Sequence, residues 1–401
     1  MLLQDKLISR EMVPRKRALI ISTIPITVKS FYLQIAEALK QNGLEIFFAF
    51  SKGPEADIIG KLGYKFKILP MSRNPFYPGN ILSIPILALF LRKNKIYIIE
   101  TTTPVASVVG RVAAIIARVP IRINTIRGLF PKGTHKYPAM LFNLVEKVLL
   151  PFTTLTITIN REDQAKMLSK GQSDSSNVII MPCGGCGVDL RKFNIEACSP
   201  EELARLRSEF KIDEDDFVVT FIGRLASDKG IFDLIEIIRM LNDSNVKFKF
   251  LIIGEAVQGE HDAINSRQLR ALLNEERLGK KTIVTGLRED VPAILAISHI
   301  VVLPSYREGF GLVLAEAAAM GKLAVAYENA GTMEAIDDGH TGILVEKGDV
   351  KGMARAIEGI ARDTATYEAM SKSAFEKAQR EFNIEFVIDK YKQLYEGFLN
   401  D

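Results

Sequence analysis

The feature that most constrains the fold is an alternation of short apolar runs with amphipathic segments, which occurs in both halves of the chain. In the first half the runs are 18–22, 45–50, 66–69, 96–99, 152–160 and 178–181. In the second half they are 217–222, 248–253, 282–285, 299–303 and 323–327. Apolar runs that alternate with helical segments are typical of parallel strands in βαβ units. The sequence therefore predicts an α/β protein with two parallel sheets, followed by helices from Asp349 to the end.

The charge of the chain is divided unevenly between its halves. Residues 1–190 contain 25 lysines and arginines against 12 aspartates and glutamates, and the remainder contains 27 against 36. A basic half points to an extended anionic partner, either a membrane surface or a nucleic acid. Nucleic acid is disfavoured because the basic residues lack an interleaved aromatic platform for stacking bases. A solvated basic face without a partner is the other interpretation.

One apolar segment of the first half fits a membrane contact. Residues 81–91 read ILSIPILALFL, with Phe76 and Tyr77 before them and a basic run, 92–95, after them. This segment is too short to span a bilayer, which needs about 20 residues. It is either a buried helix or an interfacial segment with aromatic and basic flanks.

The cysteines give little evidence of chemistry. The chain has three cysteines, which favours a reducing compartment over a disulfide framework. Cys183 and Cys186 form a Cys-x-x-Cys pair, but a zinc site needs a second pair or histidines at matching spacing. We therefore expect no metal site.

Two loops of the second half carry the residues expected to bind a ligand. Arg224 and Lys229 lie in a loop after the run 217–222, and arginine and lysine at one sheet edge would neutralise a diphosphate. The segment 303–316, LPSYREGFGLVLAE, reads as a strand end, a glycine turn and the start of a helix. A helix N-terminus at that turn would favour a phosphate. The phosphate-loop and dinucleotide fingerprints are absent, which disfavours an ATPase and a dehydrogenase.

Glu308 and Glu316 lie in the same segment, eight positions apart. That spacing corresponds to about two helical turns, so both carboxylates could line one wall of a site. The local pattern is equally compatible with one exposed and one capping carboxylate on an ordinary helix.

Several motifs in combination resemble a known family. They are FIGRLASDKG, LIIGE, VTGLREDVPAIL, LPSYREGFGLVLAEAAAMGKLAVA and DDGHTGILVEKGD. In order and spacing they resemble the donor-binding lobe of retaining glycosyltransferases of family 4. In the first half, TTTPVASVVGRVAA and INTIRGLF resemble the acceptor lobe of bacterial enzymes that elongate lipid-linked polysaccharide precursors.

The resemblance implies a GT-B architecture, in which two Rossmann-like lobes with parallel sheets face each other across a cleft. On this basis residues 1–195 are expected to form an acceptor-binding, membrane-facing lobe and residues 196–380 the nucleotide-sugar lobe. Residues 381–401 are expected to form a C-terminal helix that crosses back to the first lobe.

The resemblance also implies roles for individual residues of the second half. Arg224 and Lys229 would hold the donor diphosphate, and Glu308 would contact hydroxyls of the donor sugar near the reacting carbon. The backbone N–H groups of the turn Gly309, Phe310 and Gly311 would help to hold the phosphates. Glu316 would bind the ribose hydroxyls. The base pocket would be formed by Gly254, Glu255, Leu287 and Arg288.

The implied reaction retains the anomeric configuration without an enzyme nucleophile. The leaving diphosphate would assist deprotonation of the incoming hydroxyl while Arg224 and Lys229 stabilise the charge that develops on it. No cofactor or metal is expected, since the substrate itself is a nucleotide sugar, most commonly a UDP-sugar in this family.

The acceptor side departs from the family pattern. Many relatives have a histidine in the first lobe where this chain has Arg127, and arginine cannot act as a base. Arg127 could instead contact a phosphate of the donor or of the acceptor. The glycine pair that relatives carry after the first strand is replaced by residues 24–27, IPIT.

The function that these features favour is a glycosyltransferase at the cytoplasmic face of the cell membrane, held there by peripheral contact with anionic lipid. It would transfer a sugar from a nucleotide diphosphate to a polyprenyl-diphosphate-linked or other lipid-linked saccharide. The alternatives are a nucleotide-sugar epimerase of the same architecture, a glycosyltransferase with a soluble acceptor, and a non-enzymatic nucleotide-sugar-binding protein.

Overall fold

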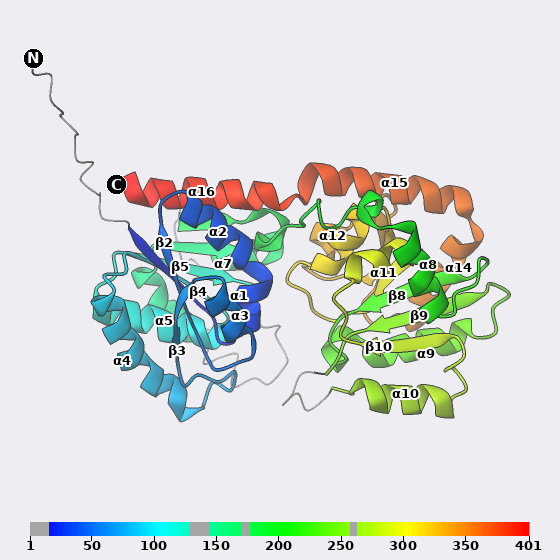
Figure 1. Cartoon of the computed structure of the whole chain (residues 1–401), viewed down its shortest axis with the longest axis horizontal. Coiled ribbons are helices and arrows are strands. Elements are labelled where there is room, and N and C mark those ends of the chain that lie inside the picture. The colour runs from blue at the N-terminus through cyan, green and yellow to red at the C-terminus, as the bar shows by residue number, and fades with distance from the viewer. Residues whose placement is uncertain (1–15, 129–143, 170–176, 257–262, 401) are drawn as a thin grey trace, which may run out of the picture. The chain divides into compact units, whose positions relative to one another are not determined.

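The computed structural model of the protein describes residues 16–128, 144–169, 177–256 and 263–400. The chain divides into two compact units. The first contains residues 1–157, 170–179 and 388–401, and the second contains residues 158–169 and 180–387. Each unit is built on one sheet with helices on both of its faces (Figure 1). The predicted α/β class with two Rossmann-like sheets is confirmed.

The first sheet has seven strands in the order β3-β2-β1-β4-β5-β6-β7. They are β1 (Arg17–Ile21), β2 (Glu45–Phe50), β3 (Lys65–Ile68), β4 (Ile98–Thr102), β5 (Ile121–Ile126), β6 (Leu155–Thr158) and β7 (Val178–Ile180). The pairs from β3 through β5 are parallel. The central strands read as nearly continuous apolar runs because helices cover both faces.

Five helices lie between the first five strands. They are α1 (Pro25–Phe31), α2 (Leu33–Gln41), α3 (Glu55–Lys61), α4 (Pro78–Lys93) and α5 (Pro104–Ala117). α4 and α5 pack side by side, and the buried faces of both helices join Leu19, Phe47 and Ile99 of the sheet in one apolar cluster. The apolar segment 81–91 is therefore part of a helix with one buried face.

The second sheet has six parallel strands in the order β10-β9-β8-β11-β12-β13. They are β8 (Phe217–Ile222), β9 (Phe248–Ile253), β10 (Thr282–Gly286), β11 (Ile300–Leu303), β12 (Leu323–Tyr327) and β13 (Gly342–Val345). This order is that of a dinucleotide-binding fold, in which ligands bind at the carboxyl edge where the strand order reverses. That point lies between β8 and β11.

The helices of the second unit follow the same alternation. They are α7 (Arg161–Ser169), α8 (Pro200–Glu209), α9 (Ile231–Leu241), α10 (Ser266–Glu275), α11 (Val291–Ile297), α12 (Leu312–Ala319), α13 (Thr332–Ala335), α14 (Val350–Arg362) and α15 (Thr364–Glu381). α8 and α11 bury Leu206 and Ile294 against β8 and β9 in one apolar cluster. The last helix, α16 (Ile384–Asn400), begins after a break at Phe382 and Asn383. Its residues from Ile388 onward belong to the first unit.

The units differ from the expected domains in residues 158–169, 180–195 and 381–387. Residues 158–169 and 180–195 cluster with the second unit, although the sequence assigned them to the first. The polar, glycine-rich stretch 182–201 suggested a linker between the two domains. Its glycines instead allow the stretch to pack tightly within the second unit. The backbone N–H of Val188, for example, donates to Phe382 O at 2.7 Å.

Candidate functional site

The loops after β8 and β11 meet at the carboxyl edge of the second sheet. The loop after β8 contains Arg224 and a short 3₁₀ turn, Ser227–Lys229, before Gly230 caps α9. Gly230 has a φ of 69°, and a Cβ atom there would lie 1.8 Å from the carbonyl oxygen of Pro304. Only glycine permits this approach, which holds the loop with Arg224 and Lys229 against the loop that carries Glu308.

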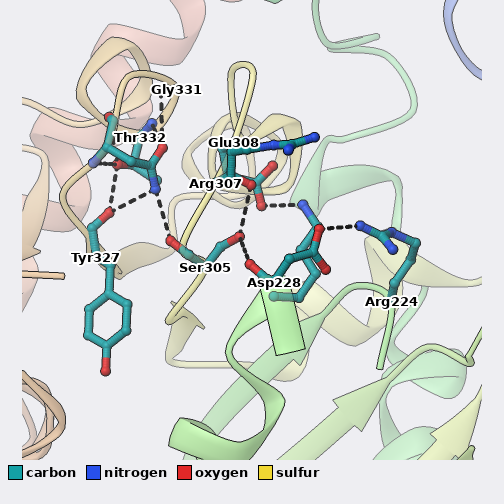
Figure 2. Close-up of polar contacts among 10 residues, drawn as sticks. Arg224, Asp228, Ser305, Arg307, Glu308, Tyr327, Gly331 and Thr332 are labelled. Carbon is teal, nitrogen blue, oxygen red and sulfur yellow. Dashed lines mark hydrogen bonds and ion pairs between the residues drawn. The ribbon is translucent and has the colours of Figure 1, made fainter. Parts of the chain in front are cut away.

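Each of the two cations in this site is paired with a carboxylate. Lys229 Nζ lies 2.6 Å from Glu308 Oε1, and both side chains are largely buried. Arg224 donates to Asp228 Oδ2 at 2.7 Å in a half-exposed pair. Figure 2 shows Glu308, Asp228 and Arg224 together on this edge. Each of these two positive charges is therefore paired with one negative charge.

A backbone framework fixes the position of these charges. Tyr306 N donates to Asp228 O at 2.9 Å, and the buried hydroxyl of Ser305 lies 3.2 Å from the same oxygen and 3.1 Å from Arg307 O (Figure 2). Asp228 therefore makes two kinds of contact. Its carboxylate pairs with Arg224, and its backbone carbonyl accepts hydrogen bonds from the neighbouring loop. Asp228 and Ser305 join the candidate site although the sequence analysis did not select either.

The loop with Glu308 is also supported from the side of β12. The amide of Asn329 donates to Ser305 O at 3.0 Å, and its carbonyl oxygen accepts from Gly331 N at 3.1 Å. A Cβ atom on Gly331 would lie 2.7 Å from the backbone of Glu308 and 2.6 Å from Phe310 N. Gly331 has an ordinary φ of −82°, so close packing, not backbone conformation, requires glycine here.

The turn after Glu308 presents its backbone to the site and buries its side chain. Phe310 is buried and packs edge to face on Phe382 at 5.7 Å between ring centroids. Gly311 has a φ of 75° and caps α12. Asn160 Nδ2 donates to Gly309 O at 3.0 Å and fixes the turn from the start of α7. The N–H of Leu314 in the first turn of α12 already donates to Gly311 O at 2.8 Å. The N–H groups before it face the carboxyl edge of the sheet, where a helix start can bind an anion.

Glu316 lies about one turn into α12 and is half-buried. Burial raises the pKa of its carboxyl group to about 7, and the charge of Lys192 opposes that shift. Because the folded-state pKa lies above the ordinary value of 4.5, the stability that this group contributes is present below pH 4.5. It is lost as the pH rises through 7.

The carboxylate of Glu255 is engaged in hydrogen bonds within the protein. One oxygen accepts from Ser266 N at 2.8 Å and from Ala256 N at 3.1 Å, and the other from Ser266 Oγ at 2.6 Å. Burial acts to raise the pKa of Glu255, but these hydrogen bonds outweigh it and the pKa is lowered. Glu255 thus anchors the N-terminal end of α10. Gly254 N donates to Gly286 O at 2.9 Å and ties β9 to β10 at the same edge.

The two residues after β10, Leu287 and Arg288, differ in whether their side chains are already engaged within the protein. Leu287 is 82% exposed and available to a ligand. The guanidinium of Arg288 is held by Asp290 at 2.6–2.8 Å and by Glu209 at 2.7 Å, which raises its pKa. Of the predicted base pocket, Leu287 alone thus offers a largely exposed side chain, while Glu255 and Arg288 are engaged within the protein.

Arg127 belongs to the first unit and follows β5. Its guanidinium carbon lies 4.7 Å from the ring centroid of Phe31 and 5.0 Å from that of Tyr32. These cation–π contacts hold the positive charge over two aromatic rings at the carboxyl edge of the first sheet.

The cysteine pair is buried and bonded to the backbone. Cys183 Sγ lies 2.6 Å from Glu381 O, and Cys186 Sγ lies 3.7 Å from Cys183 O. Burial raises the pKa of Cys183 to about 12, so its reactive thiolate form is suppressed. Within the described residues, the three carboxylates close enough to share a metal ion are Asp213, Asp215 and Asp216. They precede β8, at the opposite edge of the sheet from Glu308.

Comparison with known proteins finds a family match within the second unit. Residues 204–377 match the family model described as Glycosyl transferases group 1. This range contains the Arg224, Lys229, Glu308 and Glu316 positions, so the model covers the loops described above.

Relatives and solved structures match nearly the whole chain. The capsular polysaccharide biosynthesis glycosyltransferase CapM of Staphylococcus aureus is 26% identical over 89% of this chain and 93% of its own length. UDP-Gal:alpha-D-GlcNAc-diphosphoundecaprenol alpha-1,3-galactosyltransferase of Escherichia coli is 26% identical over 92% of this chain and 93% of its own. The crystal structure of Anabaena HepE with UDP and glucose matches with a TM-score of 0.79 at 21% identity, covering 96% of this chain and all of HepE.

Proposed function

The chain is a glycosyltransferase with a group 1 domain over residues 204–377 and a GT-B fold, and from this premise we propose its substrates and mechanism. It transfers a sugar from a UDP-sugar to a polyprenyl-diphosphate-linked saccharide, with retention of anomeric configuration and without a metal ion or cofactor. The observation that carries this proposal is the pairing of Lys229 with Glu308 at the switch point of the second sheet.

The donor fits the charges of this edge. A nucleoside diphosphate brings negative charge that can replace the carboxylates on Lys229 and Arg224. The start of α12 adds hydrogen-bond donors on the same side. HepE, which shares the fold, binds UDP. As the phosphates take over Lys229, Glu308 is released next to the position that the sugar would occupy.

The proposed reaction needs charge stabilisation and positioning from the protein. Arg224 and Lys229 stabilise the negative charge that grows on the leaving diphosphate. Glu308 holds hydroxyls of the donor sugar so that the acceptor hydroxyl attacks from the face that the diphosphate leaves. Glu316 accepts hydrogen bonds from the ribose. The two glutamates belong to one helix and its preceding turn, and neither acts as the nucleophile.

The raised pKa of Glu316 leads to a pH prediction. We expect the affinity for UDP to rise about tenfold between pH 6 and pH 8, because the carboxylate that accepts from both ribose hydroxyls forms as the pH passes about 7. Calorimetric titration of UDP across this range measures the effect. In Glu316→Gln the side chain does not ionise, so the same titration of this variant measures the pH dependence of the affinity that comes from UDP itself. An identical pH dependence in both proteins would contradict the role of Glu316.

The acceptor and the membrane are assigned to the first unit. The relative from Escherichia coli acts on a diphosphoundecaprenol-linked sugar, as its name states. In this chain, α4 exposes Ile81 by 74%, Leu82 by 58% and Leu89 by 68%, although it is packed against α5 on its other face. Exposed apolar residues on one helix face suit the interfacial region of a bilayer. No helix in the described parts of the chain is long and apolar enough to cross a membrane.

The ends of α4 add features of an interfacial helix. Phe76 and Tyr77 precede it and are exposed, and Arg92 and Lys93 lie in its last turn. Aromatic rings prefer the headgroup level, and cations are attracted by anionic lipid. We therefore place the enzyme at the inner face of the cell membrane, held by α4 as a peripheral contact.

Vesicle binding tests this contact. We expect the double variant Ile81→Glu/Leu89→Glu to lose at least about tenfold in affinity for vesicles that contain one quarter phosphatidylglycerol, since two charges must enter the interface. Co-sedimentation with the vesicles measures binding. The matched control is Met240→Glu/Phe375→Glu, which alters two exposed apolar residues of the second unit. Equal binding by both double variants would contradict the assignment of α4.

A transfer assay tests the proposed function as a whole. The wild-type protein is incubated with a panel of radiolabelled UDP-sugars and other nucleotide sugars, with and without a bacterial membrane lipid extract. Label that enters the lipid phase supports the proposal. Epimerised sugar formed without lipid would instead support an epimerase, and label on a soluble saccharide would support a soluble acceptor.

A further inference from the structure

The first unit contains a buried carboxylate that is not part of the proposed donor site. Glu100 occupies the middle of β4 and is fully buried. A carboxylate buried in this way is costly unless it is paired or fully hydrogen-bonded. The surroundings of Glu100 therefore require an explanation in terms of partners.

Four hydroxyl groups donate to Glu100. Oε1 accepts from Tyr32 at 2.9 Å, from Thr125 at 2.7 Å and from Tyr391 at 3.1 Å. Oε2 accepts from Tyr395 at 2.8 Å. All four donors are neutral and buried, so they satisfy the oxygens but do not neutralise the charge.

The cation near this cluster is Arg127. Its guanidinium lies over the rings of Phe31 and Tyr32. Burial and the charge of Glu100 raise the pKa of Tyr32 to about 12, whereas the charge of Arg127 and its hydrogen bond to Tyr32 act to lower it. The phenol of Tyr32 thus touches the carboxylate on one side and the guanidinium on the other.

This bridge reaches the carboxyl edge of the sheet. Arg127 follows β5 directly, and the carboxyl ends of parallel strands are where such sheets bind ligands. Glu100 and Tyr32 lie behind it, within the core. The negative charge in the core and the aromatic rings beside the guanidinium would restrict the rotamers of a long side chain that otherwise costs entropy to order.

We propose that Tyr32 and Glu100 are positioning residues, which hold the guanidinium of Arg127 at the sheet edge for binding a phosphate group of a substrate. The inference rests on the proposed function, because that function supplies two phosphate-bearing substrates. A planar guanidinium held in one orientation can bind a phosphate with two parallel hydrogen bonds. The diphosphate of a prenyl-linked acceptor and that of the nucleotide donor are the two sources of such a group.

The variant Tyr32→Phe isolates the bridge. It keeps the ring beside Arg127 and removes only the hydroxyl group that contacts Glu100. We expect it to weaken the binding of one phosphate-bearing probe about tenfold, the effect of losing a hydrogen bond to a charged group. The probes are farnesyl diphosphate, for the prenyl diphosphate of the acceptor, and UDP, for the donor. Isothermal titration measures both, and the weakened probe identifies the source of the phosphate.

Two comparisons separate positioning from structure. In the Arg127→Ala background, Tyr32→Phe is expected to cause no further loss, because it acts through Arg127. The control is Tyr395→Phe, which removes a hydroxyl group from the same carboxylate at its other oxygen. Arg127 affects the pKa of Tyr32 but is not among the groups that shift that of Tyr395. We expect Tyr395→Phe to lower Tm and leave both affinities within twofold of the wild type.

The outcomes divide clearly. Unchanged affinities for both probes in Tyr32→Phe, an additive loss in the double variant, or an equal loss in Tyr395→Phe would each overturn the inference. A wild-type protein that binds neither probe would overturn it too. Failure of the proposed function is seen elsewhere, in the wild-type transfer assay, where no label would enter the lipid phase.

Discussion

Replacement of Glu308 by glutamine is expected to lower the rate of sugar transfer by at least about a hundredfold. Glutamine keeps the size of the side chain but removes the charge that pairs with Lys229 at 2.6 Å. It would no longer hold the donor hydroxyls as a carboxylate does. Because Lys229 is then free of its partner, we expect UDP to bind at least as tightly as in the wild type. The transfer assay and a UDP titration measure the two effects.

The opposite responses of turnover and binding make this prediction specific. A merely unfolded or loosened site would lose both. The control is Glu328→Gln, an exposed glutamate that follows β12 at the same edge, and its activity should match the wild type. Full transfer activity in Glu308→Gln would remove Glu308 from the reaction.

Replacement of Glu146 by alanine is expected to have the largest effect on stability. Its carboxylate pairs with Arg111, and the two side chains are 6% and 1% exposed. Arg111 also donates to Ser107 O at 3.1 Å and to Ser107 Oγ at 2.8 Å, which holds the guanidinium inside the first unit. Removing Glu146 leaves a buried positive charge without its counter-charge. We expect a loss of about 3–5 kcal/mol in the free energy of unfolding, measured by urea denaturation.

Two variants test this explanation. The double variant Arg111→Met/Glu146→Leu removes both charges and should recover most of the stability, since an apolar pair of similar volume often replaces a buried ion pair at little cost. Glu162→Ala breaks the half-exposed pair with Lys166 and should change the stability by less than about 1 kcal/mol. If Glu146→Ala proves at least as stable as Glu162→Ala, the buried pair is not important for stability.

The sheets were largely predictable because their strands are continuous apolar runs. β2, β8, β9 and β12 begin and end at the predicted residues. Two strands were missed: β5, whose apolar run is interrupted by Arg122 and Asn124, and β13, a run of four residues that begins with Gly342. Other errors lie where polar residues or proline occur inside an element. β4 continues through Glu100 to Thr102, although the glutamate suggested the end of the strand. α1 begins at Pro25, because proline is well tolerated in the first turn of a helix, and it is not among the elements expected from the sequence.

The candidate site was predictable as a set of loops but not as a set of contacts. Arg224, Lys229 and Glu308 come from loops at one sheet edge, and the strand alternation alone places them together. Their partners could not be read from the sequence. Asp228 uses its carbonyl oxygen as well as its carboxylate, and Asn160 reaches Gly309 across 149 positions. The hydroxyl groups around Glu100 are likewise scattered from Tyr32 to Tyr395, so no local pattern reveals them.

If the proposed donor binds at this edge, its diphosphate exchanges with two carboxylates that already pair with the cations. A diphosphate that binds to Lys229 and Arg224 displaces Glu308 and Asp228, and few condensed counterions need to be released from the cations. Donor affinity should therefore depend less on salt than two bare cations would predict. In the proposed function, selectivity then comes from a donor whose sugar hydroxyls give the displaced Glu308 new hydrogen-bond donors.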